Sequence, residues 1–225
     1  MTPIQKIWEE LKFISDCSNL EEKQIEAILP VLKEEASTRE VSRIKNLMKR
    51  SGIKRIKRLE DFDWKFNPQI PRNEIMAFNG TSWNQAKNLV LIGPSGIGKT
   101  HLATALCYGA IQKGIPTAFV TCADLIEKLK RSTSKYTILH YYSTVKLLCI
   151  DELGYVFPNQ EQANDIFQII SKRSELVSTI ITTNLIPSNW GKIFEASTAT
   201  AILDRLILNG KFISNDGDTY RGRKQ

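Results

Sequence analysis

The sequence predicts an α/β domain built on a parallel sheet and preceded by a small helical region. Five short apolar or β-branched segments follow residue 59, and stretches with helical periodicity separate them. These segments are residues 89–92, 117–121, 146–150, 179–183 and 211–214. Such alternation is typical of a parallel sheet with helices on both faces. Ligands of these sheets bind at the carboxyl ends of the strands, so polar residues that follow a strand are candidate site residues.

The chain is expected to divide into a helical N-terminal domain, residues 1–58, and an α/β domain, residues 59–225. Apolar residues near the N-terminus recur at three- and four-residue steps, which indicates a first helix. Ser-x-x-Glu sequences begin at Ser18 and at Ser37 and have the spacing of capping boxes. They predict a second helix and a third helix, the third ending at Gly52.

Composition excludes several classes of protein. The 225 residues are 42% hydrophobic and 24% charged, as in ordinary globular domains. No run approaches the roughly 18 apolar residues of a membrane span, and Lys6, Glu9 and Glu10 interrupt any signal peptide. We therefore expect a cytoplasmic protein without a membrane partner. Four scattered cysteines and two histidines argue against a zinc site, and the net charge of +7 favours a polyanionic partner.

A glycine-rich loop directly after the first predicted strand matches G-x-x-x-x-G-K-[ST]. It consists of Gly93, Pro94, Ser95, Gly96, Ile97, Gly98, Lys99 and Thr100, and His101 follows it. In this motif, backbone N–H groups and a helix N-terminus surround phosphates. Lys99 would contact the β- and γ-phosphates, and the Thr100 hydroxyl would ligate Mg²⁺. An ordinary glycine turn is the alternative, but the preceding strand favours a site for ATP and Mg²⁺.

Two acids end the third predicted strand. The apolar residues 147–150 lead directly into Asp151 and Glu152, an arrangement typical of a Walker B strand. Asp151 would hold Mg²⁺ through water, and Glu152 would polarise the water that attacks the γ-phosphate. The alternative is that they are simply two acids at the exposed end of a strand, which the glycine-rich loop about fifty residues upstream disfavours. The fourth predicted strand ends in Asn184, which would orient that water or serve only as a turn residue.

A basic stretch joins the two predicted domains. Nine cations and a single acid, Glu40, lie within residues 39–58. The best candidates for DNA contact are Arg39, Arg43, Lys45, Lys49, Arg50, Lys54 and Arg55. Such a charge density attracts DNA phosphates without reading base sequence. The alternative is a solvated basic face.

Several segments together resemble one family, the IstB helper ATPases of insertion sequences, which are relatives of the DnaC and DnaI helicase loaders. The segments are LEDFD at 59–63, GKTHLA at 98–103, DELGY at 151–155, ITTNL at 181–185, WG at 190–191, LDRL at 203–206 and YR at 220–221. The resemblance spans residues 4–223 and is strongest from residue 59 onward. It implies an AAA+ P-loop NTPase with a five-stranded parallel sheet and a small helical N-terminal domain. Because the chain ends soon after the last predicted strand, we expect no C-terminal lid of the kind that larger AAA+ proteins have.

The resemblance also implies an activity and residue roles. The chain would form a homo-oligomer with ATP on duplex DNA and help a transposase to select its target. Lys99 and Thr100 take the Walker A positions, Asp151 and Glu152 the Walker B positions, and Asn184 the sensor-1 position. Arg205 takes the position of the arginine finger, which would reach the γ-phosphate held by a neighbouring subunit. A surface arginine paired with Asp204 is the alternative for Arg205.

Four other functions stay open. The closest is the loading of a replicative helicase, because the ATPase core is the same in both families. The others are a small-molecule P-loop kinase, a DNA-binding scaffold that only holds ATP, and an insertion-sequence remnant without activity. The favoured hypothesis is a DNA-stimulated ATPase that serves transposition.

Overall fold

The protein, seen here as a computed structural model, forms two compact units. The structure describes all residues except 1, 81–82, 84–85, 218 and 221–225. The units are Met1–Asn46 and Leu47–Gln225. The boundary expected after residue 58 therefore lies inside the second unit. The reason is a backbone hydrogen bond of 2.6 Å, in which Phe119 N donates to Ser51 O, because it holds residue 51 against the sheet.

The N-terminal helices differ from the expected three. Helix α1 (Pro3–Glu10) begins with a capping box, in which the Thr2 side chain accepts from Gln5 N and the Gln5 side chain accepts from Thr2 N. Helix α2 (Glu22–Arg50) is a single helix of 29 residues. The prediction that a new helix starts at Ser37 is wrong, since no glycine or proline interrupts residues 31–50. Ser18 forms no capping box, and its N–H donates to Asp16 instead.

The second unit contains the expected parallel sheet. Its strands are β1 (Asn88–Ile92), β2 (Thr117–Thr121), β3 (Leu147–Leu153), β4 (Ser178–Thr183) and β5 (Gly210–Ser214). All pairings are parallel, and the order across the sheet is β2-β3-β4-β1-β5. This confirms the five predicted strands. Because all strands run the same way, β1, β3 and β4 end at one edge of the sheet, and their terminal residues meet there.

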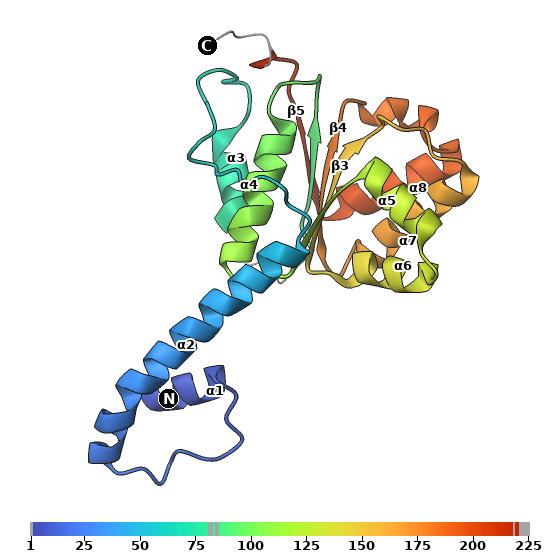
Figure 1. Ribbon diagram of the computed structural model, residues 1–225. Helices are drawn as coiled ribbons and strands as arrows, with labels where there is room; N and C mark the ends of the chain where they lie inside the picture. The colour runs from blue at the N-terminus through green and yellow to red at the C-terminus, as the bar shows by residue number, and fades with distance from the viewer. Residues whose placement is uncertain (1, 81–82, 84–85, 218, 221–225) are drawn as a thin grey trace. The chain divides into compact units, whose positions relative to one another are not determined.

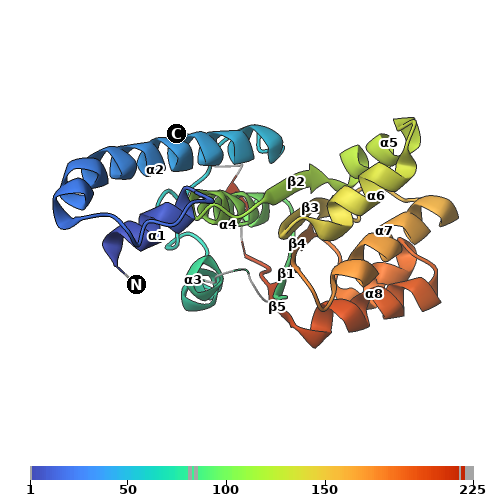
Figure 2. The same cartoon turned by 90° about the horizontal axis from the view of Figure 1, so that it is seen from below.

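Helices cover both faces of this sheet, as Figures 1 and 2 show. The elements are α3 (Arg72–Gly80), α4 (Lys99–Gln112), α5 (Cys122–Arg131), α6 (Lys135–Thr144), α7 (Gln160–Arg173), a 3₁₀ helix (Pro187–Lys192) and α8 (Ala196–Leu208). Helices α3 and α4 lie on one face, and α5 to α8 lie on the other. Among the described residues, no helix is long and apolar enough to span a bilayer.

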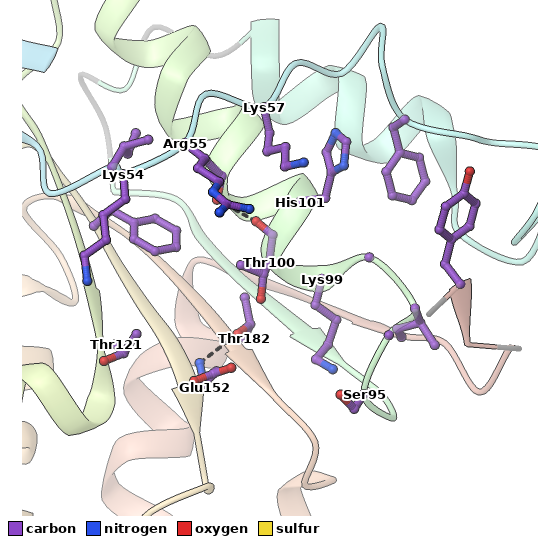
Figure 3. A pocket seen from close by; sticks show the side chains of 18 of the residues that line it. Lys54, Arg55, Lys57, Ser95, Lys99, Thr100, His101, Thr121, Glu152 and Thr182 are labelled. Carbon is purple, nitrogen blue, oxygen red and sulfur yellow. Dashed lines mark hydrogen bonds between the residues drawn. The ribbon is translucent and has the colours of Figure 1, made fainter. Parts of the chain in front are cut away.

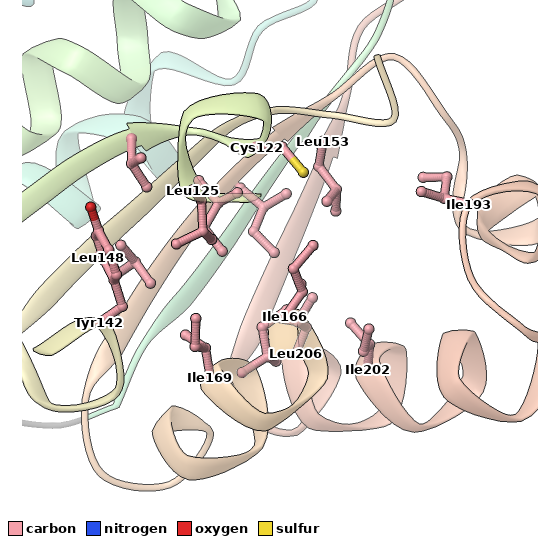
Figure 4. Packing of buried hydrophobic residues seen from close by; sticks show 14 of the residues in the cluster. Cys122, Leu125, Tyr142, Leu148, Leu153, Ile166, Ile169, Ile193, Ile202 and Leu206 are labelled. Carbon is pink, nitrogen blue, oxygen red and sulfur yellow. The ribbon is translucent and has the colours of Figure 1, made fainter. Parts of the chain in front are cut away.

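Two hydrophobic clusters anchor these layers. One packs α4, α3 and the segment around Leu59 and Phe62 against one face of the sheet. The other packs Leu125 of α5, Ile166 of α7 and Ile202 of α8 against the opposite face, as Figure 4 shows. Both faces of the strands are thus buried, which explains why β1 and β4 consist of buried residues from end to end. The site lies at the carboxyl edge of this rigid sheet.

Candidate nucleotide site

The glycine-rich loop has the backbone that its sequence predicts. Gly93, Gly96 and Gly98 have φ angles of +148°, +89° and +100°. Residues with a Cβ rarely adopt φ angles in this range. A Cβ on Gly93 would lie 2.1 Å from Asn215 O, and Gly98 forms the N-cap of α4. The loop therefore needs glycine for both its turn and its close approach to the chain after β5.

Two neighbouring segments hold this loop in place. On one side, Asn67 Nδ2 donates to Ile97 O at 3.4 Å. On the other side, Tyr220 N donates to Gly96 O at 2.9 Å. The rings of Phe66 and Tyr220 then meet edge to face, with centroids 5.0 Å apart. The loop is fixed between the segment that precedes α3 and the segment that follows β5.

Lys99 lies inside the loop, with a buried stem. Its Nζ donates to Gly93 O at 2.7 Å and to Pro94 O at 2.8 Å. These two carbonyls hold the ammonium group at the mouth of the loop, where a cation compensates phosphate charge. Gly93 and Pro94 thus act through Lys99, whereas residues 95–101 line the adjoining pocket.

Asp151 joins the loop to the Walker B strand. The Thr100 hydroxyl donates to Asp151 Oδ1 at 3.0 Å, and the Thr182 hydroxyl donates to the same oxygen. Burial raises the pKa of the Asp151 carboxyl, while bonds from Thr182 and Thr100, the charge of Lys99 and the Glu152 amide act in the opposite direction. A hydroxyl and a buried carboxylate are hard oxygen ligands, so the pair suits Mg²⁺, which takes few protein ligands and completes its shell with phosphates and water.

A β-bulge turns the second acid toward the same pocket. In the pairing of β3 with β4, Ile150 lies opposite Ile181 and Leu153 lies opposite Thr183. Asp151 and Glu152 therefore share the single residue Thr182. Glu152 adopts a φ of +61°, and its N–H donates to Thr182 Oγ1 at 2.9 Å (Figure 3). Bulges re-aim side chains in this way, and here Glu152 lines the pocket.

A pocket of about 810 Å³ lies over these residues. It is lined by residues 52–57, 61–63, 66–67, 95–101, 104, 119–121, 124, 152, 155, 182 and 220. This volume falls within the usual range of ligand pockets, roughly 300–1,000 Å³. His101 lies at its wall, where its Nε2 is 2.9 Å from Arg58 O. The pocket belongs entirely to the second unit.

Two predicted catalytic residues do not line this pocket. Asn184 follows the end of β4 and is exposed. Arg205 lies at the opposite end of the sheet, where its carbonyl accepts a bond of 3.4 Å from Asn88, the first residue of β1. The Arg205 guanidinium donates to Ala201 O at 2.9 Å and stacks over the Phe167 ring at 5.0 Å. Within one chain, Arg205 is therefore remote from the glycine-rich loop.

The basic residues fall into three groups. In the first unit, Arg39 pairs with Glu35 at 2.6 Å, Arg43 pairs with Glu40 at 3.1 Å, and Lys45 is exposed. Lys49 and Arg50 are exposed at the end of α2.

The third group is Lys54 and Arg55, which line the pocket together with Lys57. Figure 3 places Arg55 and Lys57 above Thr100, and Lys54 to the left, above Thr121. Two of the seven residues chosen for DNA contact therefore face the candidate nucleotide site.

Sequence reasoning missed Thr182 and Thr121 as pocket residues. A threonine within a strand is also what β-propensity alone favours, so the sequence holds no separate signal for Thr182. Tyr155 and Tyr220 were part of the family resemblance but had no assigned role. Arg221, which follows Tyr220, lies outside the described residues.

Comparisons with known proteins agree with this geometry. The family model described as "IstB-like ATP binding protein" matches residues 6–225. The chain is 36% identical, over 202 residues, to a protein of Bacillus thuringiensis subsp. berliner named as an ATP-binding protein of insertion sequence IS232. The match covers 88% of this chain and 81% of that relative.

Solved structures with the same fold include DnaI, with a TM-score of 0.61 and 22% identity, covering 71% of this chain and 90% of that one. They also include the DnaC helicase loader, with a TM-score of 0.56 and 25% identity, covering 64% of this chain and 88% of that one. These likenesses confirm the AAA+ fold that the sequence resemblance implied. The chain belongs to the family of IstB-like ATP-binding proteins.

Proposed function

We propose that this protein hydrolyses ATP while assembled on duplex DNA and that it helps a transposase to select target DNA. The observation that carries the ATPase part is the bulge at Asp151 and Glu152. It turns Glu152 into a pocket that Lys99 and Thr100 also line, while the buried Asp151 accepts a hydrogen bond from Thr100. A site that only holds ATP needs the loop and one acid, whereas hydrolysis also needs a base for the attacking water.

Each residue has a defined task in this proposal. Lys99 binds the β- and γ-phosphate oxygens, while Thr100 and Asp151 hold Mg²⁺, Asp151 through water. When bound, Mg²⁺·ATP supplies a γ-phosphorus that water can attack, giving ADP and phosphate. Glu152 accepts a hydrogen bond from that water and draws its proton away. Asn184 follows β4 at this edge of the sheet and would orient the water.

Arg205 requires a second copy of the chain. Because it lies at the amino end of the sheet, it can approach a γ-phosphate only in a neighbouring subunit. Its interactions with Ala201 O and the Phe167 ring hold the guanidinium on the surface of α8. An arginine that enters the site from a neighbour would make hydrolysis depend on assembly.

Two parts of the proposed function, DNA binding and help to a transposase, rest on the positive charge of the chain and on the names of its relatives. The net charge is +7, and the cations from Arg39 to Arg50 on α2 are exposed. The relative from Bacillus thuringiensis is named for an insertion sequence. We infer that α2 contacts DNA phosphates, so affinity for duplex DNA should fall steeply between about 50 and 200 mM salt. A binding constant independent of salt would refute this contact.

Loading of a replicative helicase is the second candidate, favoured by the likeness to the DnaC helicase loader. The two functions differ in the partner that changes ATP turnover. Adding a partner transposase should accelerate turnover on DNA if the protein serves transposition. Acceleration by the replicative helicase alone would establish the second candidate instead.

The deciding experiment measures ATP turnover with and without duplex DNA for the wild type and for Glu152→Gln. We expect DNA to stimulate the wild type and the variant to turn over ATP at least about 100-fold more slowly, since a general base contributes roughly 10²- to 10⁴-fold. ATP affinity should be unchanged, because the loop and Lys99 are intact. Equal turnover by both proteins would refute the catalytic assignment.

A further inference from the structure

The bulge in β3 creates a local demand for hydrogen bonds that a regular strand would not have. Two residues of β3, Asp151 and Glu152, lie opposite the single residue Thr182 of β4. A bulge disrupts the ladder locally, so the extra backbone groups need partners from elsewhere. Glu152 also has a φ of +61°, a conformation that persists only when its surroundings hold it.

The Thr182 side chain meets this demand. Its hydroxyl accepts from Glu152 N at 2.9 Å and donates to Asp151 Oδ1. A threonine hydroxyl has one donor and two acceptor sites, so it can make both bonds at once. Thr182 is 1% exposed and is fixed between β3 and β1, where it pairs with Leu91. The group that holds the bulge is therefore itself held by the sheet.

We propose that Thr182 is the positioning residue of the ATPase site, because its hydroxyl locks the bulge that turns Glu152 into the pocket and holds Asp151 beside Thr100. This inference rests on the proposed ATPase function and deepens it. Thr182 acts through Glu152, which it holds for the attacking water, and through Asp151, whose Oδ1 it shares with Thr100. It links the sensor strand β4 to the Walker B strand without contacting the reacting atoms.

The test compares Thr182→Val, which has the same shape but no hydroxyl, with Thr182→Ser, which keeps the hydroxyl. The matched control is Thr117→Val, because Thr117 is also buried in a strand but begins β2 at the far end of the sheet. We expect Thr182→Val to lower kcat for ATP roughly 10- to 100-fold, within the contribution of a general base. KM should change by less than about threefold, and serine should restore most of the rate.

A second readout needs neither ATP nor turnover. In Thr182→Val, hydrogen exchange at the Glu152 amide should accelerate at least about tenfold, while exchange at Ile150 stays unchanged. Thr117→Val should leave the Glu152 amide unchanged. An unaltered Glu152 amide in Thr182→Val would overturn the inference even if the protein proved to have no ATPase activity.

A double-mutant cycle separates positioning from general damage. In the Glu152→Gln background the base is already lost, so adding Thr182→Val should lower the rate by a smaller factor than it does in the wild type, because only the part that acts through Asp151 remains. A full additional loss would mean that Thr182 does not act through Glu152, and would overturn the inference. A wild type without turnover would refute the proposed function instead, so the two failures are distinguishable.

Discussion

Replacing Gly93 with alanine tests whether the backbone of the glycine-rich loop is as constrained as its geometry indicates. Gly93 has a φ of +148°, and a Cβ there would lie 2.1 Å from Asn215 O and 2.5 Å from Ile97 Cδ1. The first neighbour is a backbone carbonyl whose residue also donates from its N–H to Ile92 O at 3.0 Å. The carbonyl therefore cannot retreat without pulling the segment after β5 away from β1.

The cost can be estimated from these two features. A residue with a Cβ in such a region of φ costs about 1–3 kcal/mol. Forcing a methyl group into a filled space costs about 1–3 kcal/mol more. The sum of roughly 2–6 kcal/mol is a large part of the 5–15 kcal/mol that stabilises a typical domain. With about 2–4 °C per kcal/mol for a chain of this size, a mid-range cost of about 4 kcal/mol would lower Tm by about 8–16 °C.

Urea titration followed by circular dichroism measures this loss, and titration with a fluorescent ATP analogue measures binding below the transition. The control is Gly191→Ala, because a Cβ on Gly191 meets nothing within 4 Å and should change stability by less than about 0.5 kcal/mol. We expect Gly93→Ala also to weaken ATP binding at least about tenfold, since the loop must shift. A Gly93→Ala protein as stable as the control and equal to it in affinity would refute the reasoning.

Two further predictions concern buried charge. Asp151→Asn should raise the free energy of unfolding at neutral pH while abolishing turnover, because burial raises the Asp151 pKa above its ordinary 3.8 and so makes the ionised form costly in the folded state. The increase in the free energy of unfolding over wild type, measured by urea titration, should shrink as pH falls through that raised pKa and vanish below pH 3.8. Arg173→Met should lower the free energy of unfolding by about 3–5 kcal/mol, because it leaves the carbonyls of Tyr142, Val145 and Ser178 without their buried donor. Thermal melts measure this loss of stability, and a loss below about 1 kcal/mol would contradict the prediction.

The sheet could be predicted because each strand has a local sequence pattern of its own. Residues 89–92 and 179–183 are β-branched or apolar runs between polar segments, and the structure extends each strand by only one residue. The glycine-rich loop was equally predictable, since its motif fixes both backbone and neighbours. Burial on both faces left few alternatives for these segments.

Features that depend on pairing across the sheet could not be predicted. The bulge at Asp151 and Glu152 exists only in the register of β3 against β4, which no local pattern encodes. The same holds for Lys54 and Arg55, whose charge predicted DNA contact. Their place at the pocket follows from the path of the chain, because Ser51 is bonded to β2 and the Arg58 carbonyl to His101.

The hydrogen bond between Ser51 and β2 also bears on how this protein avoids aggregation through the edge of its sheet. Phe119 N, which donates to Ser51 O, lies on the edge of β2 that faces away from β3. An uncovered strand edge is a template on which another chain can add a strand. A fragment that begins at residue 59 would lose this cover and invite edge-to-edge aggregation, whereas one that begins at Leu47 would keep it.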